Sequence, residues 1–413
     1  MGALENAPYA KPDMTHLDSL TVLSLEQATT LPYMTLKLVM DGMRVIRLES
    51  PPRGDPNRWV GPQVLPSSNG GTSFESGMNA YFLPNNLGKE SITLNLVEQA
   101  GREILHRLIR ETPIDIFATN QRPDSYKKLG IDYETLSAVK PDLIWVGITG
   151  FGPTSNEAAY DPILQARAGF MELTGEAHGD PMVFGLPMVD LGAGEHAYGL
   201  VMKALYHRAV TGEGARLDIS MFQSAVSWMV SPVLLSRSFD VKAARRGNTH
   251  QFFAPVSVYP TSDGFVYLAV GNDRQWEALT GQAGFESLAN ENYKHNAGRI
   301  AAVEELNRQL SAIFKKYSTA EIIEMCNKIG APISRVNDIP QVCADPLIAS
   351  QLVKARDSRS GIEIAIPPPA VISAHLKDKG LTLGFPPRLG EHNESIFGAL
   401  RCNVNELKEK GIV

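Results

Sequence analysis

Residues 183–224 read VFGLPMVDLGAGEHAYGLVMKALYHRAVTGEGARLDISMFQS. The pattern predicts a loop that ends at Asp190, then a helix, a Gly-rich turn and a short strand. Asp190 occupies the position at which a side-chain oxygen of Ser, Thr, Asp or Asn usually caps a helix. Gly192 and Gly194 remove side chains from the first turn, so we expect room for a bulky ligand there. The stretch thus predicts a helix N-terminus that presents a carboxylate beside open space.

The Asp190 carboxylate has two interpretations. At a Gly-lined helix N-terminus it is partly desolvated while the helix dipole favours its charged form, and both properties suit a nucleophile. The alternative is a helix cap without a chemical role, which this stretch alone favours because caps are far commoner than nucleophiles. Glu195 and His196, which follow on the same helix, are interpreted as surface or interface residues.

Upstream, the order of apolar segments predicts a doubly wound α/β fold. Apolar runs at Leu20–Ser24 and Arg44–Glu49 are typical of buried strands, and a helix is expected between them from about residue 31 to 42. The Rossmann dinucleotide fingerprint is absent from this unit, because the loop after the first run has no glycine. The later Gly-x-Gly-x-x-Ala run at 192–197 matches only a looser form, and Pro187 leaves no strand before it.

Further strands are expected at Ser91–Asn95, Ile114–Thr119 and Leu143–Ile148, and residues 51–90 predict a long surface loop. Ligands collect beyond the carboxyl ends of parallel strands in open α/β sheets. Arg122, with the nearby lysines 127 and 128, follows the second of these strands and is therefore a candidate phosphate contact. A solvated basic turn is an equally good interpretation of this segment.

The pattern changes near residue 245. We expect a large domain at 1–224, a linker at 225–244, a small α+β domain at 245–335, an extended Pro-rich return at 336–380, and a terminal helix pair at 381–413 that completes the large domain. The secondary structure predicted for the small domain comprises strands near Val256–Pro260 and Phe265–Val270 and helices at Arg274–Thr280, Arg299–Lys316 and Thr319–Lys328. A single helix of roughly Met221–Leu235 is expected to lead out of the large domain.

Composition narrows the classes of function. The chain has 413 residues and a formal net charge of −6 without a basic block, which argues against nucleic acid as a partner. Its three cysteines are far apart and match no metal-ligand spacing, which favours a reduced cytoplasmic setting and no metal. No stretch approaches the ~20 apolar residues of a membrane span, so no membrane contact is expected.

Seven stretches in order resemble the class III CoA-transferases, the family that includes formyl-CoA transferase, carnitine CoA-transferase and α-methylacyl-CoA racemase. They are VLSLEQATTLPYMTLKLVMDGMRVIRLESPPRGDPNR (22–58), TNQRPDSYKKLGIDYETL (119–136), KPDLIWVGITGFGP (140–153), YDPILQARAG (160–169), VDLGAGEHAYGLVMKALYHRAVTGEGARLDISM (189–221), RRGNTH (245–250) and PRLGEHNESI (387–396). The resemblance covers nearly the whole chain, and with it the nucleophile becomes the favoured interpretation of Asp190.

The resemblance implies a Rossmann-like large domain built from both chain ends, a small central domain, and two subunits interlocked as rings. It also implies that Asp190 attacks an acyl-CoA thioester, that a mixed anhydride and then an aspartyl-CoA thioester form, and that CoA passes to an acceptor carboxylate. Gly192 and Gly194 would leave space for the thioester. Coenzyme A and acyl-CoA enter as substrates, and no prosthetic group is implied.

Further site residues are implied by the resemblance. The family's strand-end turn that contacts CoA corresponds to Asn120, Gln121, Arg122 and Lys128, and its second CoA loop corresponds to Thr149, Gly150 and Phe151. The loop after the first strand corresponds to Thr29 and Thr30, and the glycine lid over the active site corresponds to Gly247, Asn248 and Thr249. Lys89 is a further candidate CoA contact. Formyl-CoA transferase has a glutamine in the loop matched by Thr29 and Thr30. The lid is shorter in glycine here, so a less mobile lid is expected.

The main alternative activity is racemisation. The racemase branch has a histidine before the Asp of a helix start, whereas this chain has Tyr160 before Asp161, and tyrosine is a poor base near neutral pH. Transfer is therefore favoured, and a non-catalytic partner subunit of a hetero-oligomer is the second alternative. We expect a homodimer, succinyl-CoA as donor, and a succinate-like acceptor such as benzylsuccinate or malate. Candidate cationic contacts for the acceptor are Arg53, Arg58, Arg245, Arg246 and His250.

Overall fold

The computed structural model describes residues 15–65 and 78–413. The Ser- and Gly-rich part of the predicted long loop, PSSNGGTS (66–73), lies outside these residues. The chain forms two compact units. Unit 1 comprises Met1–Ala168, Gly185–Val230 and Ser350–Val413, and unit 2 comprises Gly169–Phe184 and Ser231–Ala349. Residues 169–184, expected in the large domain, thus group with unit 2, and residues 350–380, expected in a linker, group with unit 1.

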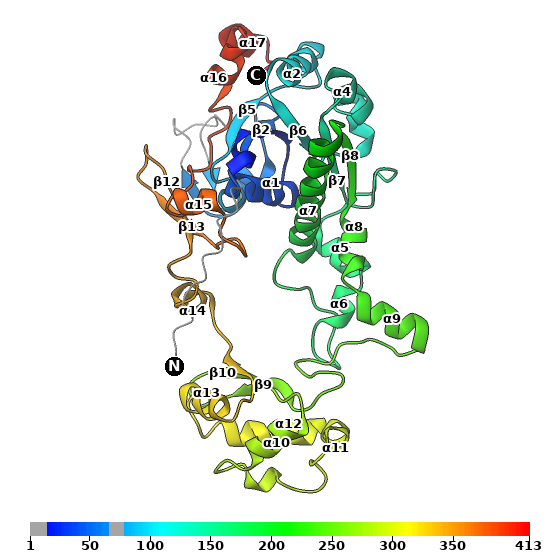
Figure 1. Ribbon diagram of the computed structural model, residues 1–413, viewed down its shortest axis with the longest axis vertical. Coiled ribbons are helices and arrows are strands. Elements are labelled where there is room, and N and C mark those ends of the chain that lie inside the picture. The colour runs from blue at the N-terminus through cyan, green and yellow to red at the C-terminus, as the bar shows by residue number, and fades with distance from the viewer. Residues whose placement is uncertain (1–14, 66–77) are drawn as a thin grey trace. The chain divides into compact units, whose positions relative to one another are not determined.

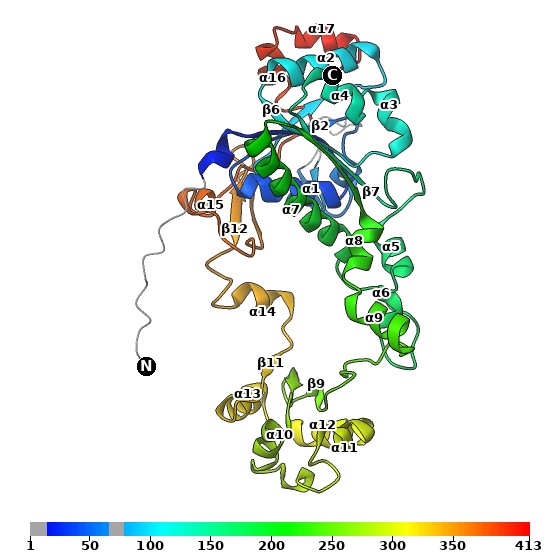
Figure 2. The ribbon, with the colours of Figure 1, turned by 45° about the vertical axis from the view of Figure 1, so that its right-hand side comes forward.

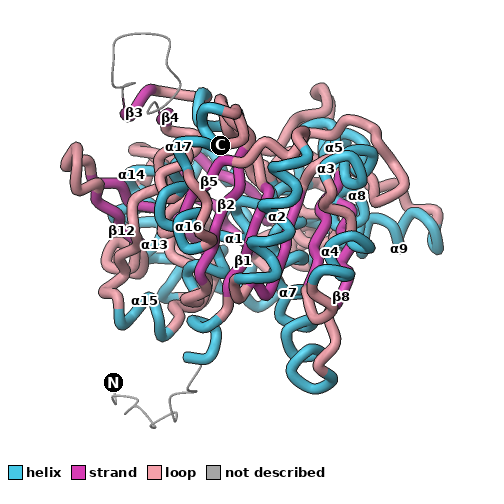
Figure 3. The backbone as a smooth tube through the Cα atoms, turned by 90° about the horizontal axis from the view of Figure 1, so that it is seen from above, coloured by secondary structure: helices cyan, strands magenta, loops and turns pink. Residues whose placement is uncertain are grey.

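The centre of unit 1 is a six-stranded parallel sheet with the strand order β5-β2-β1-β6-β7-β8 (Figure 3). The strands are β1 (Thr21–Leu25), β2 (Arg44–Glu49), β5 (Glu90–Thr93), β6 (Ile114–Thr119), β7 (Ile144–Thr149) and β8 (Ala215–Ser220). β1, β6 and β7 are almost wholly buried, as the near-continuous apolar runs predict for a parallel sheet covered on both faces. The predicted α/β class with a parallel sheet is confirmed.

The strand order has one reversal. From β1 the chain moves outward through β2 to β5, then returns to the other side of β1 and moves outward again through β6, β7 and β8. The loops that leave β1 and β6 therefore diverge to opposite faces of the sheet, and the crevice between them is where ligands collect in doubly wound folds. This topology positions the candidate site.

Helices cover both faces of the sheet in unit 1 (Figure 2). One face carries α2 (Gln99–Glu111), α4 (Tyr133–Val139), α16 (Asn393–Ala399) and α17 (Val404–Glu409), and the other carries α1 (Thr30–Met40) and α7 (Met188–Thr211). Leu105, Trp145 and Phe397 are fully buried in the core under the first group. The C-terminal segment packs there against the N-terminal half of the chain, because the Asn95 N–H donates to the Ile412 carbonyl at 2.7 Å. N-terminal and C-terminal parts of the chain therefore build one unit.

Smaller elements complete unit 1. They are α3 (Tyr126–Leu129), α5 (Asp161–Arg167), α8 (Met221–Ser227), α15 (Ala374–Asp378) and the strand pairs β3 (Gln63–Leu65) with β4 (Met78–Asn79) and β12 (Val353–Arg356) with β13 (Glu363–Ile366). The expectation of an extended return at 336–380 is wrong, because an antiparallel hairpin forms there and buries Val353 and Ala355. The expected helix at 221–235 is also wrong as one element, since it breaks into α8 and α9 (Val230–Phe239).

Unit 2 contains a three-stranded antiparallel sheet with its own apolar core (Figure 1). Besides α9, which lies almost entirely in this unit, its helices and strands are α6 (Phe170–Leu173), β9 (Val256–Pro260), β10 (Phe265–Ala269), α10 (Asp273–Thr280), α11 (Asn296–Ala301), α12 (Val303–Phe314), α13 (Thr319–Lys328), β11 (Ile333–Arg335) and α14 (Ile339–Ala344). The predicted helix at 299–316 is two helices. Arg299, on the first of them, is fully buried and donates from Nε to the Ala254 carbonyl at 2.6 Å.

Candidate active site

A cavity of about 200 Å³ lies at the carboxyl ends of β1, β6 and β7 in unit 1. Its walls come from the loop after β1 (Gln27, Ala28, Thr30), the turn after β6 (Asn120, Gln121, Arg122, Pro123), the end of β7 and its loop (Ile148, Thr149, Gly150, Ser155, Glu157 to Asp161), and Asp190 and Met221. This is the crevice that the reversal of strand order creates, so the topology and the cavity agree on one location.

Asp190 lies in the first turn of α7, and its carboxylate faces α1. The helix begins at Met188 with Pro187 at the N-cap position, so the expectation that Asp190 caps the helix is wrong. Instead, the Thr30 hydroxyl donates to Asp190 Oδ1 at 2.5 Å. A hydrogen bond from a residue 160 positions away orients the carboxylate, and the carboxylate lines the cavity.

Asp161, at the start of α5, supplies the cap that α7 lacks. Its Oδ2 accepts from the backbone N–H groups of Val189 at 2.7 Å and Asp190 at 3.0 Å, and its Oδ1 accepts from Gln165 Nε2 at 2.5 Å. Asp161 is 6% exposed. A carboxylate at a helix N-terminus satisfies orphan donors and interacts favourably with the helix dipole, whichever segment supplies it. The first turn of α7, and with it Asp190, is thereby held in place.

The pKa of Asp190 is raised to about 6, chiefly because burial penalises the charged form. The Thr30 hydrogen bond acts in the opposite direction, and the negative charge of Asp161 adds to the rise. A carboxylate with a pKa near 6 remains mostly ionised at pH 7 and is more basic than an ordinary aspartate. Both properties suit a nucleophile toward a thioester carbonyl.

The glycines of α7 serve close packing. A Cβ at Gly192 would lie 2.1 Å from the Trp228 ring, and one at Gly194 would lie 2.8 Å from the Tyr33 ring and 3.1 Å from the Thr30 carbonyl oxygen. The expectation that these glycines leave space for a thioester is therefore wrong, because neighbouring side chains fill that space. Gly194 instead lets α1 approach α7 closely enough for Thr30 to reach Asp190.

In the turn after β6, one predicted residue binds the neighbouring backbone and two others line the cavity. Both polar ends of the Asn120 amide bind the Gln27 backbone, since Oδ1 accepts from its N–H at 3.1 Å and Nδ2 donates to its carbonyl at 2.8 Å. Gln121 and the exposed Arg122 line the cavity beside it. Lys128 is exposed on α3 and is absent from the cavity wall.

At the end of β7, Thr149 and Gly150 line the cavity. The Thr149 hydroxyl accepts from the Gly152 N–H at 3.1 Å, and a Cβ at Gly150 would lie 2.3 Å from that of Ala159. Phe151 is absent from the cavity wall. Its ring packs 5.7 Å from that of Phe222, and the Arg167 guanidinium lies 4.3 Å from its centroid.

Other predicted contacts are not among the residues that line the cavity. Lys89 is fully buried, donates to Glu26 at 2.7 Å and to the Pro32 carbonyl at 2.9 Å, and its pKa is lowered to about 8 by burial. Thr29 is buried at the N-cap position of α1, next to the wall residue Thr30. Gly247, Asn248 and Thr249 belong to unit 2, where the Gly247 N–H donates to the Gly175 carbonyl.

Two of the candidate acceptor contacts have carboxylate partners. Arg58 is 1% exposed and forms a two-point ion pair with Glu49, with Nη2–Oε1 at 2.6 Å and Nε–Oε2 at 2.8 Å. The expectation that Arg58 contacts an acceptor is wrong, since its guanidinium is enclosed in the core. Arg245 pairs with Glu172 at 2.6 Å within unit 2. Arg246 and His250 line a separate cavity in that unit.

Several wall residues are not among the contacts predicted from the sequence, and Gln27, Ala28 and Asp161 are the most informative of them. No motif marks Gln27 or Ala28, and Asp161 enters the sequence analysis only as the residue after Tyr160. The signal that identifies Asp161 is spatial, because its hydrogen bonds reach 28 and 29 positions along the chain. Among residues 15–65 and 78–413, no group of three or more His, Cys, Asp or Glu side chains is arranged to hold a metal ion.

Comparison with known proteins identifies the family of this chain. Residues 17–393 match CoA-transferase family III. The chain belongs to this family. It is 31% identical over 410 residues to the succinate–glutarate CoA-transferase of Agrobacterium fabrum, with 96% of this chain and 98% of the relative aligned. It is 30% identical to the human succinyl-CoA:glutarate CoA-transferase, with 96% and 90% aligned.

A solved structure extends the likeness to three dimensions. The CaiB/BaiF family protein from Brucella suis superposes with a TM-score of 0.80 at 31% identity, over 93% of this chain and 99% of that one. The enzyme class is thus established as a CoA-transferase that acts on CoA thioesters. None of the helices in the described part of the chain is both long and apolar enough to cross a membrane.

Proposed function

We propose that this enzyme transfers CoA from an acyl-CoA donor to a carboxylate acceptor, with Asp190 as the covalent nucleophile. The observation that supports this most is the Asp190 carboxylate itself. It lines the cavity at the sheet's switch point, is held by Thr30 at 2.5 Å, and has its pKa raised to about 6. It therefore combines access to the cavity with a basicity above that of a surface aspartate.

The proposed reaction has four balanced steps. Ionised Asp190 attacks the donor thioester carbonyl, the C–S bond breaks, and a mixed anhydride and CoA thiolate result. The thiolate attacks the aspartyl carbonyl of the anhydride, which releases the donor acid as a carboxylate and leaves an aspartyl-CoA thioester. The acceptor carboxylate attacks this thioester, and a second anhydride and thiolate form. The thiolate then attacks the acceptor carbonyl, which yields the new acyl-CoA and restores the Asp190 carboxylate.

Two backbone features suit the oxyanions of these steps. The first turn of α7 presents N–H groups and the positive end of the helix dipole near Asp190, although the N–H groups of Val189 and Asp190 already bind Asp161. The N–H groups of Gln27 and Ala28 are likewise bound, to Asn120 and Asp55, so we assign oxyanion contact to the wall residues Thr30 and Gly150. Gln121, Arg122 and Thr149 are the proposed contacts for CoA, with Lys128 at its outer end.

The donor is proposed to be succinyl-CoA and the acceptor a dicarboxylic acid, in line with the relatives named above as succinate–glutarate and succinyl-CoA:glutarate CoA-transferases. These names favour glutarate over benzylsuccinate and malate as the first acceptor to assay. We further propose a cytoplasmic homodimer of interlocked subunits. Light scattering of the purified chain tests the dimer, and a monomer that is active only with a second protein would indicate a hetero-oligomer.

Trapping the intermediate tests the proposal. The protein is incubated with succinyl-CoA, quenched with hydroxylamine or borohydride, and the modified peptide is mapped by mass spectrometry. We expect modification of Asp190 that requires the acyl-CoA, is absent in Asp190→Asn, and persists in the matched control Asp180→Asn, which alters an exposed carboxylate of unit 2. An unmodified Asp190 together with deuterium exchange at the α-carbon of a branched acyl-CoA would indicate racemisation instead.

A further inference from the structure

Ala28 adopts an uncommon backbone conformation in the wall of the cavity. Its φ is +61°, in the left-handed region that an L-residue with a Cβ seldom occupies. It lies two residues before Thr30, whose hydroxyl binds Asp190. Strained residues of this kind persist only where the surrounding structure holds them, and they concentrate at functional sites.

Two side chains from one short turn hold Ala28 by both of its backbone polar groups. Asp55 Oδ1 accepts from the Ala28 N–H at 3.1 Å, and Asn57 Nδ2 donates to the Ala28 carbonyl at 2.9 Å. Asp55 Oδ1 also accepts from the Asn57 N–H at 2.9 Å, which ties the two holding residues together. From the other side, Asn120 binds both backbone polar groups of Gln27. The loop after β1 is thus clamped at consecutive residues.

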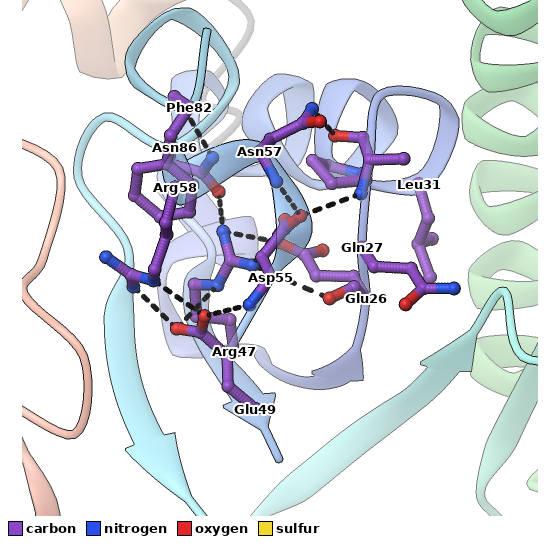
Figure 4. A network of polar contacts seen from close by, with 12 residues as sticks. Glu26, Gln27, Leu31, Arg47, Glu49, Asp55, Asn57, Arg58, Phe82 and Asn86 are labelled. Carbon is purple, nitrogen blue, oxygen red and sulfur yellow. Dashed lines mark hydrogen bonds and ion pairs between the residues drawn. The ribbon is translucent and has the colours of Figure 1, made fainter. Parts of the chain in front are cut away.

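The holding turn is itself anchored in a buried ionic network (Figure 4). Arg47 Nη2 donates to Asp55 Oδ2 at 2.9 Å, and the Asp55 N–H donates to Glu49 Oε2 at 3.0 Å. The side chains of Arg47 and Asp55 are fully buried, and that of Glu49 is 1% exposed. Figure 4 shows Arg47 between Glu49 and Asp55, with Asn57 directed at the loop that carries Gln27. A charge network shielded from water resists displacement, so the turn is a rigid support.

We infer that Asp55 and Asn57 are positioning residues for the active site. By holding Ala28 in its left-handed conformation they fix the loop after β1, and thereby the Thr30 hydroxyl on the Asp190 carboxylate. Neither residue lines the cavity, so each acts through Ala28 and not on the substrate. The inference deepens the proposed function, because its kinetic part rests on Asp190 as the nucleophile.

The test is a double-mutant cycle between Asn57 and Ala28. Asn57→Ala deletes the bond to the Ala28 carbonyl without disturbing the ionic network. Ala28→Gly removes the Cβ that makes φ +61° unfavourable, so the loop needs less support. Asn79→Ala is the matched control, because Asn79 makes the same kind of bond, from Nδ2 to the Gly61 carbonyl at 3.0 Å, outside the cavity. Each variant is assayed for kcat and KM with succinyl-CoA and glutarate and for hydrogen exchange in peptides that span residues 26–31.

We expect Asn57→Ala to lower kcat about tenfold, the effect of about one lost hydrogen bond, with a smaller change in the KM for succinyl-CoA. Exchange at residues 26–31 should accelerate by a similar factor. In the Ala28→Gly background the same substitution should lower kcat less than about threefold, and Asn79→Ala should change neither readout.

Equal losses of kcat in both backgrounds would overturn the inference, because they would show that Asn57 acts independently of the Ala28 conformation. Unchanged exchange in Asn57→Ala would overturn it as well. The exchange experiment does not depend on catalysis. It therefore tests whether Asn57 holds the loop at residues 26–31 even if the trapping experiment shows that Asp190 is not the nucleophile. Accelerated exchange at 26–31 with slow exchange elsewhere separates the clamp from a general loss of folding.

Discussion

The raised pKa of Asp190 predicts that the native aspartate destabilises its own fold at neutral pH. A carboxyl whose folded-state pKa lies above its unfolded value contributes stability fully below the unfolded pKa, near 3.8, and loses it as the pH rises through the folded pKa, about 6. Asp190→Asn removes this titration but retains an oxygen that can accept from Thr30. We therefore expect Asp190→Asn to be inactive and more stable than the wild type above pH 6.

The magnitude follows from the two pKa values. A shift from 3.8 to about 6 corresponds to about 3 kcal/mol at pH 8, where the carboxyl is ionised in both the folded and unfolded states. At pH 5 the same shift corresponds to about 1.6 kcal/mol, because the folded protein still binds most of a proton. The stability advantage of Asp190→Asn should thus grow by about 1.4 kcal/mol between pH 5 and pH 8.

Urea unfolding of wild type and variant at the two pH values measures this change, with tryptophan fluorescence reporting on the buried Trp145 of unit 1. All other titrating groups are common to both proteins and cancel in the difference. Asp180→Asn, which alters an exposed carboxylate, is the control and should show no pH-dependent difference. An advantage that is the same at pH 5 and pH 8, or a variant less stable than the wild type at pH 8, would refute the assignment of a raised pKa to Asp190.

Three further predictions concern the same unit. The kcat/KM for succinyl-CoA should fall about tenfold per pH unit below pH 6, where Asp190 becomes protonated. Asp161→Asn should move this fall to lower pH, because it removes a negative charge that raises the pKa of Asp190. An unchanged pH profile in Asp161→Asn would argue against an electrostatic interaction between the two carboxylates. Gly194→Ala should lower kcat at least about tenfold, because the added Cβ would push α1 and Thr30 away from Asp190. Gly199→Ala is the control and should leave kcat unchanged, because no atom lies within 4 Å of the added Cβ. Equal kinetics for the two variants would contradict the packing argument. Arg58→Met should lower the stability of unit 1 by about 3–5 kcal/mol, because the buried Glu49 loses a partner. The KM for the acceptor should not change. A higher KM at an unchanged melting temperature would indicate that Arg58 contacts the substrate after all.

The sequence by itself determined the class of fold and much of its secondary structure. The predicted bounds of β2 at Arg44–Glu49, β6 at Ile114–Thr119 and α13 at Thr319–Lys328 coincide with the structure. These elements follow from apolar periodicity and local propensity, which a single segment contains in full. The sequence likewise pointed to the turn after β6 and to the Gly-rich start of α7, where part of the cavity wall is found.

Only the tertiary structure decided what individual side chains do. Arg58 and Lys89 are polar in sequence and suit a ligand, yet the fold encloses them with Glu49 and Glu26. The cap of α7 comes from Asp161, whereas Asp190 itself binds Thr30, 160 positions away.

The physical reason is that hydrogen bonds and ion pairs act over about 3 Å in space, irrespective of separation along the chain. Parallel strands place segments from distant parts of the sequence at one edge of the sheet, and the order of the strands decides which segments meet. Local pattern therefore predicts the elements and their polar ends. The partners of Asp190, Ala28 and Arg58 exist only once the sheet has assembled.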